Sequence, residues 1–227
     1  RSVRELAASV AHEIRNPLGA IQNSVALLRR DLVVEEEDRT LLAVIDRCLR
    51  RSTRELEGLL GAVRSIPMRL VPAPIAPLLE ELHDEIAQRA AAAGVTLQWQ
   101  ANGHCHCHID PGRLQQAIAN LLYNAIEAVT PGRGTVGLTA SCSALSLRID
   151  VSDDGPGIDP TIRQRLFTPF ATTKAQGMGL GLAGSRRTVE AMGGDLRLLT
   201  AGDGDEPTCF SIVLPIAGAA EREEATA

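Results

Sequence analysis

The sequence predicts two domains: an α-helical hairpin over residues 1–66 and an α+β sandwich over residues 67–217, followed by a polar tail over residues 218–227. Two observations predict this fold class. Apolar residues recur at steps of three and four through the first domain, which is the period of a helix that packs along one side. In the second domain, helical patterns are separated by short stretches in which apolar and polar residues alternate, as they do in strands.

The first helix is expected over residues 1–32. One side of it carries a heptad seam of apolar residues, made of Leu6, Val10, Ile14, Pro17, Ile21, Val25, Leu28 and Leu32. His12 lies two residues after Val10 and therefore projects off this seam, where an ordinary surface histidine is the simplest interpretation. Pro17 should kink the helix one turn after His12, because a proline inside a helix costs about 3 kcal/mol or more.

A second seamed helix is expected after the acidic turn at residues 35–38, and it continues to about Arg64. Two helices with a short connection form an antiparallel hairpin, which is too small to bury both apolar seams by itself. Dimerisation into a four-helix bundle would bury them. The alternative is an intramolecular coiled coil that packs on the second domain.

Composition excludes some classes of function. With 23 Lys and Arg against 28 Asp and Glu, the net charge is −5, so there is no overall basic surface for nucleic acid. The sequence has no apolar run of the roughly 18 residues that a transmembrane helix needs. Five cysteines argue against a complete set of disulfides and favour a reducing compartment. Residue 1 falls inside a helical pattern, so we expect a cytoplasmic fragment whose membrane anchor, if it has one, lies outside the chain.

Prolines between residues 66 and 74 indicate a linker into the second domain. Beyond it, helices are expected at residues 75–93, 110–129, 160–166 and 180–192, and strands at residues 95–100, 134–140, 144–152, 195–200 and 208–214. Glycines at 94, 193 and 194 are stop signals for two of these helices. The segment 103–108, Gly-His-Cys-His-Cys-His, fits a strand better than a metal site, since no second cluster completes a tetrahedral set of ligands.

Four motifs in the second domain indicate a nucleotide site. The first is Asn120-Leu-Leu-Tyr-Asn124-Ala-Ile-Glu127, in which two amides four residues apart share one helix face. Amide oxygens suit a hard cation such as Mg²⁺, which prefers oxygen ligands when it bridges phosphates. The alternative is a pair of polar side chains that hydrogen-bond a neighbouring loop.

The second motif, Asp153-Asp154-Gly155-Pro156-Gly157-Ile158, follows a strand. Its glycines let the backbone pass close to a flat ligand, and the Asp153 carboxylate could accept a hydrogen bond from the exocyclic amine of adenine. The same residues also occur in ordinary turns.

The third motif runs from Leu166 to Lys174. Its phenylalanines, Phe167 and Phe170, are expected to anchor the base of a loop in the core. Thr172, Thr173 and Lys174 offer hydroxyl groups and a positive charge where phosphates would lie.

The fourth motif, Gly177-Met178-Gly179-Leu180-Gly181-Leu182, runs straight into a helix. Free backbone N–H groups and the helix dipole then point at the same place, which favours an anion such as phosphate. The motif lacks the strand that precedes a Rossmann loop, and the chain has no Walker sequence.

Residues 12–18, His-Glu-Ile-Arg-Asn-Pro-Leu, resemble the H-box of the dimerising, phosphoacceptor domain of bacterial sensor histidine kinases. The four later motifs, in their order along the chain, resemble the N, G1, F and G2 boxes of the catalytic domain of that family. This domain belongs to an ATPase superfamily shared with gyrase, a heat-shock chaperone and the MutL repair proteins. Each motif alone is weak, but the ordered set spans nearly the whole chain.

The resemblance implies a site for ATP and Mg²⁺ between the helix of the first motif and the loop of the third and fourth. The residues expected at the nucleotide are Asn120, Asn124, Asp153, Gly155, Gly157, Ile158, Thr172, Thr173, Lys174, Gly177, Met178, Gly179, Leu180, Gly181 and Leu182. Asp153 would recognise adenine, Asn124 with Asn120 would hold Mg²⁺, and Lys174 would neutralise phosphate charge in the transfer.

The resemblance also implies that His12 accepts the γ-phosphoryl group through a neutral imidazole nitrogen, with Glu13 as the base or hydrogen-bond partner of that imidazole. An aspartate on a response regulator would then receive the group. Asn16, on the same helix face as His12, would orient water in a phosphatase reaction. The expected assembly is a homodimer through the hairpin.

The short loop and its Thr-Thr-Lys sequence are similar to the nitrogen-regulation type of sensor kinase. Two residues depart from common members of the family: Glu127 stands where many carry Lys or Arg, although an acidic residue there is familiar in this sub-type, and Met192 replaces a histidine. One rival interpretation is a catalytically silent or phosphatase-biased docking module. The other is a chaperone- or repair-type ATPase, which would usually carry a glutamate base at the position of Asn120 and has no use for an H-box.

Overall fold

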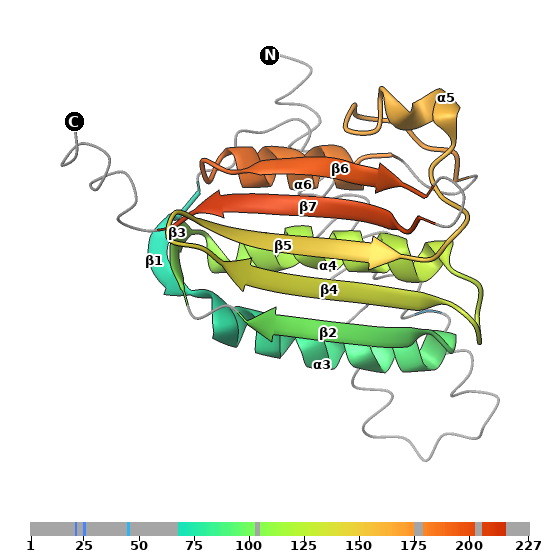
Figure 1. Ribbon diagram of the computed structural model, residues 1–227, viewed down its shortest axis with the longest axis horizontal. Coiled ribbons are helices and arrows are strands. Elements are labelled where there is room, and N and C mark those ends of the chain that lie inside the picture. Colours follow the sequence, from blue (N-terminus) through green and yellow to red (C-terminus); the bar gives the residue numbers. More distant parts are fainter. Residues whose placement is uncertain are drawn as a thin grey trace. The chain divides into compact units, whose positions relative to one another are not determined.

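Figure 1 shows the computed structural model of the chain, which divides into two compact units, Arg1–Ile66 and Pro67–Ala227. The structure describes residues 21, 25, 45, 68–102, 105–174, 179–202 and 206–216. Ile21, Val25 and Ile45 of the first unit are helical. The rest of the predicted hairpin, its seams and its H-box lie outside the described residues.

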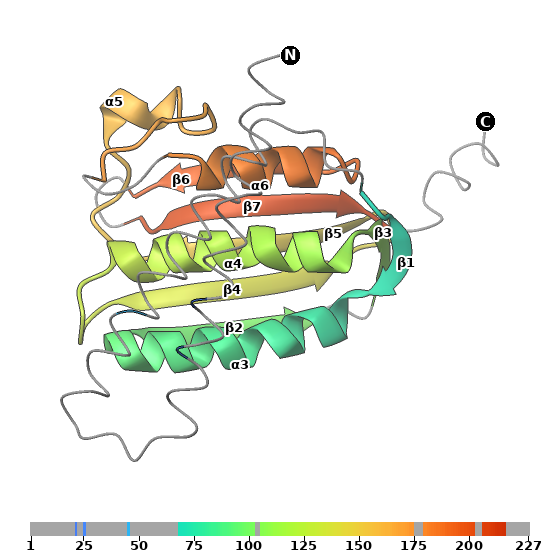
Figure 2. The ribbon, with the colours of Figure 1, turned by 180° about the vertical axis from the view of Figure 1, so that it is seen from behind.

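The second unit is built on a five-stranded sheet in the order β2-β4-β5-β7-β6. The strands are β2 (Thr96–Asn102), β4 (Thr135–Cys142), β5 (Ser146–Asp153), β6 (Asp195–Ala201) and β7 (Thr208–Pro215). Strand β2 runs parallel to β4, and the other neighbours pair antiparallel. Helices α3 (Ile75–Ala93), α4 (Pro111–Ala128) and α6 (Gly181–Glu190) lie on the same face of the sheet (Figures 1 and 2). The predicted α+β sandwich is confirmed.

The core lies between this sheet face and the helices. Helix α3 buries a stripe at helical spacing, made of Ile75, Leu78, Leu79, Leu82, Ile86 and Ala90. It ends at Gly94, whose φ of 67° is in the left-handed region that glycine adopts without strain. Helix α4 begins after Asp110, whose carboxylate accepts the backbone N–H of Arg113, with Pro111 in the first turn. Gly94 therefore fixes where α3 ends, and Asp110 fixes where α4 begins.

The expected linker is wrong at Val71–Pro74, which forms strand β1 and pairs antiparallel with β3 (His106–Ile109). Prolines two residues apart place both missing N–H groups on the same edge of a strand, so the other edge can still pair. Helix α5 (Pro160–Arg163) is shorter than predicted.

In the cysteine- and histidine-rich segment, the residues from His106 to His108 form part of strand β3, as predicted. In β3, Cys107 is buried while His106 and His108 are exposed, and burial raises the pKa of the Cys107 thiol to about 11. A disulfide joins Cys105 to Cys142 at the end of β4, a pair that the sequence does not single out. Within the described residues, no three His, Cys, Asp or Glu side chains gather as metal ligands. None of the helices in that part of the chain is long and apolar enough to cross a membrane.

Candidate nucleotide site

Those predicted site residues of the second unit that the structure describes gather at one end of the sheet. Helix α4 ends there, and so do strands β5 and β6, as Figure 1 shows. These elements are far apart in the sequence, but in the folded domain their ends lie at the same end of the sheet. The site is therefore made of loops and element ends that a rigid scaffold holds in place.

The two amides of α4 have different partners. Asn120 donates through Nδ2 to Oγ of Ser185, 3.1 Å away on α6. Asn124 accepts through Oδ1 from the Nζ of Lys174, at 3.1 Å. Both contacts fit the alternative interpretation of this motif, in which the two polar side chains hydrogen-bond a neighbouring segment. The Asn124 oxygen nevertheless faces a positive charge already, and this is an environment that suits a cation.

Asp153, the last residue of β5, is a buried acceptor. The residue is 7% exposed, and its Oδ1 accepts the backbone N–H of Gly155 at 3.0 Å. Burial is the main reason that the pKa of Asp153 rises to about 6, while the hydrogen bonds from Gly155 and Thr208 and the charge of Lys174 act in the opposite direction. A buried carboxylate with few donors of its own can accept a hydrogen bond from a ligand.

The loop after β5 packs directly against the end of β6. Gly157 has a φ of 80°, and a Cβ there would lie 2.6 Å from the carbonyl oxygen of Gly202. The next residue, Ile158, donates its N–H to the carbonyl of Ala201 at 2.8 Å. Only glycine fits this close approach of two backbones, which holds the loop beside Asp153 in position.

The two phenylalanines of the third motif differ. Phe167 packs edge-on against Phe210, with ring centroids 6.3 Å apart, as a core anchor should. Phe170 does not, since it is 66% exposed with a φ of 70°. The chain reverses at Phe170, whose N–H donates to the carbonyl of Gly179 at 2.9 Å. This turn directs the ring away from the core, so the expectation that both rings are buried is wrong for Phe170.

The Phe170–Gly179 bond also closes the base of the predicted phosphate loop. A Cβ on Gly179 would lie 2.6 Å from the carbonyl oxygen of Ala171, so the two ends of the loop are in tight contact. In the part of the loop that follows Ala171, the hydroxyl of Thr172 accepts the backbone N–H of Lys174 at 3.0 Å, and Thr173 is exposed. Gly177 and Met178 lie outside the described residues.

Helix α6 begins beside Asn120. Leu180 is buried, and Leu182 packs against the core. A Cβ on Gly181, the first residue of the helix, would lie 2.6 Å from Oδ1 of Asn120. The first turn of α6 and the Asn120 amide therefore share one small space, where backbone N–H groups and an amide oxygen meet.

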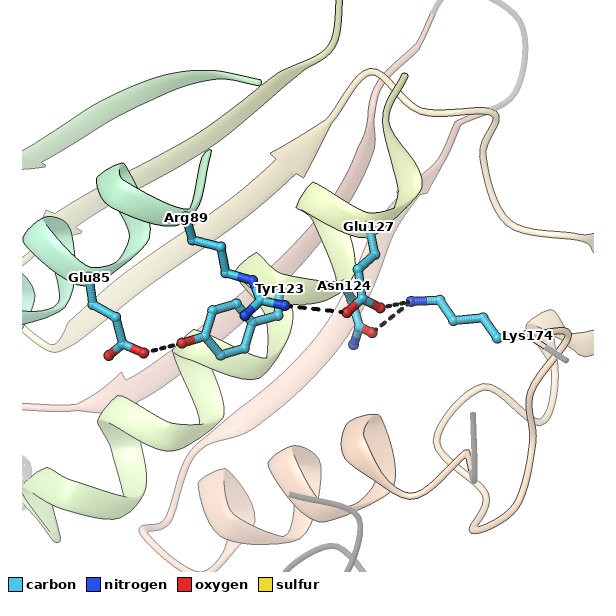
Figure 3. Close-up of polar contacts among 6 residues, drawn as sticks. All are labelled: Glu85, Arg89, Tyr123, Asn124, Glu127 and Lys174. Atoms are coloured by element: carbon cyan, nitrogen blue, oxygen red, sulfur yellow. Dashed lines mark hydrogen bonds and ion pairs between the residues drawn. The ribbon is translucent and has the colours of Figure 1, made fainter. Parts of the chain in front are cut away.

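Figure 3 shows Asn124 and Lys174 together with four polar residues that the motifs did not predict as part of the site: Glu85, Arg89, Tyr123 and Glu127. Lys174 Nζ lies 2.9 Å from Oε2 of Glu127, which stands three residues after Asn124 on α4. The sequence marks Glu127 as a departure from the family pattern, but nothing in the sequence shows that it faces Lys174. Ser185 and Thr208, the buried partners of Asn120 and Asp153, were also missed.

Together these residues can hold an adenine nucleotide. Asp153 offers a buried acceptor to an amine, the α4 amides offer oxygens to a cation, and Lys174 with the first turn of α6 offers positive charge to phosphates. The predicted acceptor of the phosphoryl group, His12, lies outside the described residues, as do Glu13 and Asn16.

Two protein families match the chain. Residues 2–65 match the His Kinase A (phospho-acceptor) domain, and residues 109–218 match the histidine kinase-, DNA gyrase B-, and HSP90-like ATPase. The sensor histidine kinase ZraS of Escherichia coli (strain K12) is 34% identical over 212 residues, which cover 93% of this chain and 45% of ZraS. The chain belongs to the sensor histidine kinases. The fold described above is therefore that of a histidine kinase core.

Two further comparisons agree with this assignment. The signal transduction histidine-protein kinase AtoS of the same E. coli strain is 33% identical over 218 residues, covering 93% of this kinase core and 34% of AtoS. The crystal structure of full-length ShkA in complex with AMPPNP superposes with a TM-score of 0.71 at 28% identity, covering 95% of this core and 46% of ShkA. The core spans less than half the length of these relatives.

Proposed function

We propose that this kinase core uses ATP to phosphorylate His12 and then passes the phosphoryl group to an aspartate of a response regulator. The observation that carries the proposal is the convergence of Asp153, Asn124 and Lys174 from β5, α4 and the loop before α6. Such a site binds a phosphorylated nucleotide, and the same chain matches a phospho-acceptor domain over residues 2–65.

In this proposal Asp153 accepts a hydrogen bond from the exocyclic amine of adenine. The buried position of its carboxylate supports this role, because an acceptor shielded from water binds a donor more strongly than an exposed one. Guanine presents a carbonyl at the equivalent position, and its oxygen would repel the carboxylate. Gly155, Gly157 and Ile158 then form the wall against which the base lies.

The phosphates lie between α4 and the start of α6. Thr172, Thr173 and Lys174 contact them from one side, and the backbone from Gly177 to Leu182 from the other. Asn124, with Asn120, holds Mg²⁺. The fit is supported by the chemistry of the donors, since amide oxygens are ligands that Mg²⁺ accepts and Asn124 Oδ1 already binds a cationic group. Bound Mg²⁺ would neutralise charge on the phosphates during transfer.

His12 is the nucleophile of the transfer. An imidazole with a pKa near 6.5 is largely neutral at pH 7, so one ring nitrogen carries a free lone pair. Glu13 accepts a hydrogen bond from the other side of the ring and keeps that tautomer in place. The imidazole attacks phosphorus, and ADP leaves.

The finer assignments follow from the same resemblance. The hairpin of residues 1–66 dimerises, residues 67–217 form the catalytic domain, and a receiver domain docks on the hairpin. Asn16 orients water for the phosphatase reaction on that receiver. The short loop and its Thr-Thr-Lys sequence support an assignment of the chain to the nitrogen-regulation type of sensor kinase.

Incubation with γ-labelled ATP and Mg²⁺ tests the proposal. We expect acid-labile, alkali-stable label on the parent chain and no label on His12→Gln. The variant should still bind ATP, because His12 belongs to a different domain from the nucleotide site. Release of phosphate to water at equal rates by parent and variant would instead identify an ATPase.

A further inference from the structure

Lys174 is the only lysine in this chain. The other 22 of its 23 Lys and Arg residues are arginines. The two side chains differ in a way that matters here: a guanidinium grips oxygens in a fixed fork, whereas an ammonium is a compact charge on a flexible stem. Lysine therefore suits a position at which a cation changes partners.

In the structure, Lys174 is bound to α4. Its Nζ donates to Oε2 of Glu127 at 2.9 Å and to Oδ1 of Asn124 at 3.1 Å (Figure 3). These two acceptors are three residues apart and share one face of the helix. The ammonium thus occupies the oxygen that our proposed function assigns to Mg²⁺.

The carboxylate of Glu127 is oriented by two helices. Its other oxygen, Oε1, lies 3.7 Å from Nη2 of Arg89 on α3. The guanidinium of Arg89 stacks 4.4 Å above the ring of Tyr123, and the Tyr123 hydroxyl donates to the Glu85 carboxylate. Glu85 and Arg89 are one turn apart on α3, as Tyr123 and Glu127 are on α4. The α3 pair and the α4 pair therefore contact each other through both of their members, and these contacts direct Glu127 toward Lys174 (Figure 3).

These contacts have a consequence for cation binding. A divalent cation and an ammonium on one amide oxygen would lie within a few ångströms of each other, where like charges repel. Lys174 must leave Asn124 when that oxygen binds Mg²⁺. Glu127 then still has Arg89 beside it, so its carboxylate is not left without a cationic partner.

We infer that Glu127 is a positioning residue that keeps Lys174 on Asn124 until Mg²⁺ and nucleotide bind, so that Lys174 and Mg²⁺ compete for one oxygen. The inference rests on the proposed function. Lys174, once released, is free to reach the phosphates. The side chains of Lys174 and Glu127 are 47% and 46% exposed, and an ion pair so open to water is weak enough to exchange.

The single lysine makes this exchange directly observable. Lysine labelled with ¹³C and ¹⁵N yields one set of side-chain resonances for the whole chain, and these can be followed at constant pH. We expect an immobilised ammonium in the nucleotide-free parent, and a distinct resonance after addition of Mg²⁺ with a non-hydrolysable ATP analogue. Nucleotide-free Glu127→Gln should show a mobile, solvated lysine, and Glu127→Asp should restore part of the immobilisation.

Calorimetric titration supplies the second measurement. Glu127→Gln should lower the Mg²⁺ concentration at half-maximal binding of the analogue about two- to fivefold, because loss of a half-exposed ion pair changes an equilibrium constant by about that factor. In a Lys174→Met background the same substitution should have no such effect, since Glu127 acts through Lys174. Glu190→Gln is the matched control, because its carboxylate pairs with Arg186 at 2.9 Å and is 47% exposed on α6.

The outcomes separate this inference from the proposed function. A parent chain that binds no nucleotide refutes both. A parent that binds Mg²⁺ and the analogue with an unchanged lysine resonance refutes the competition alone. A lysine equally immobilised in Glu127→Gln, or an effect of Glu127→Gln that persists with Lys174→Met, shows that Glu127 does not position Lys174.

Discussion

Asp153→Asn should make the kinase core more stable and a weaker nucleotide binder. Asp153 is a buried residue, 7% exposed, and burial raises the pKa of its carboxyl group from 3.8 to about 6. A shift of that size corresponds to about 3 kcal/mol between the two protonation states, as an upper bound. Above pH 6 the folded chain carries this cost, because it holds an ionised group in a poorly solvated position. An asparagine of the same shape does not.

The sign of the pH dependence follows from the direction of this shift. A pKa that is higher in the folded state means that the folded chain binds the proton more tightly than the unfolded chain does. The stabilisation that Asp153 contributes is complete below pH 3.8 and is lost as the pH rises through about 6. The free energy of unfolding of Asp153→Asn should therefore exceed that of the parent by up to about 3 kcal/mol at pH 8, and match it near pH 4.

Nucleotide binding should change in the opposite sense. A hydrogen bond to a charged acceptor contributes about 1.5–3 kcal/mol, so its loss should weaken binding of an adenine nucleotide about 10- to 150-fold at pH 8. The parent itself should bind less tightly as the pH falls below 6, since protonation removes the acceptor charge of Asp153.

Urea unfolding of parent and variant between pH 4 and 8 measures the first effect. The single tryptophan, Trp99 on β2, reports on this unit alone. Calorimetry with ADP measures the second effect. Asp154→Asn is the comparison, because Asp154 is an exposed neighbour whose carboxylate accepts the N–H of Thr135 at 2.7 Å. Its charge raises the pKa of Asp153 less than burial does, so its removal should change the stability curve less than Asp153→Asn does. Parallel stability curves for the parent and Asp153→Asn, or equal affinities for ADP, would refute the reasoning.

Three further predictions concern the same unit. Gly181→Ala should weaken binding of Mg²⁺ with an ATP analogue about tenfold in calorimetry, because the added Cβ would lie 2.6 Å from Oδ1 of Asn120. Gly184→Ala on the same helix should bind normally, because a Cβ at that position would meet no atom within 4 Å. Reduction of the Cys105–Cys142 disulfide should lower the free energy of unfolding, measured by urea titration, by about 4 kcal/mol, which is the chain-entropy value for a loop of 37 residues. The free energy of unfolding of a Cys105→Ser/Cys142→Ser variant should not change when reductant is added. Arg89→Met should raise the Mg²⁺ concentration needed for half-maximal nucleotide binding about twofold, because Lys174 is then the one cation that pairs with Glu127 and is held more tightly. Arg186→Met removes an arginine of α6 that is similarly stacked on an aromatic ring, and it should leave that concentration unchanged.

Sequence patterns predicted the second unit well because its signals are local. The apolar period of α3 and the αL glycine that ends it are both readable over twenty residues, and so is the Asp110-Pro111 start of α4. The N, G1 and G2 motifs were predicted at element ends, and the fold brings those ends together. Elements whose stability depends on distant partners were harder to predict. Strand β1 reads as a linker because two of its four residues are prolines, and its pairing with β3 is visible only in three dimensions.

The site shows the same division. Asp153 and Asn124 were identified from motifs, yet the buried hydroxyl partners Ser185 and Thr208 carry no motif of their own. Phe170 was misjudged because hydrophobicity predicts burial, whereas the backbone reversal at this residue turns its ring outward. In each case the missing information was a tertiary contact.

The contact between Glu127 and Lys174 explains why a departure from the family pattern need not damage the site. An acidic residue on α4 next to the proposed Mg²⁺ ligand would by itself repel the phosphates of a nucleotide. Lys174 and Arg89 compensate that charge from two directions, one from the loop and one from α3. The loop can therefore bring a cation to α4 that is free to leave it, which a cation built into the helix at position 127 could not do. We expect the consequence to be a lysine whose position reports on the state of the nucleotide site.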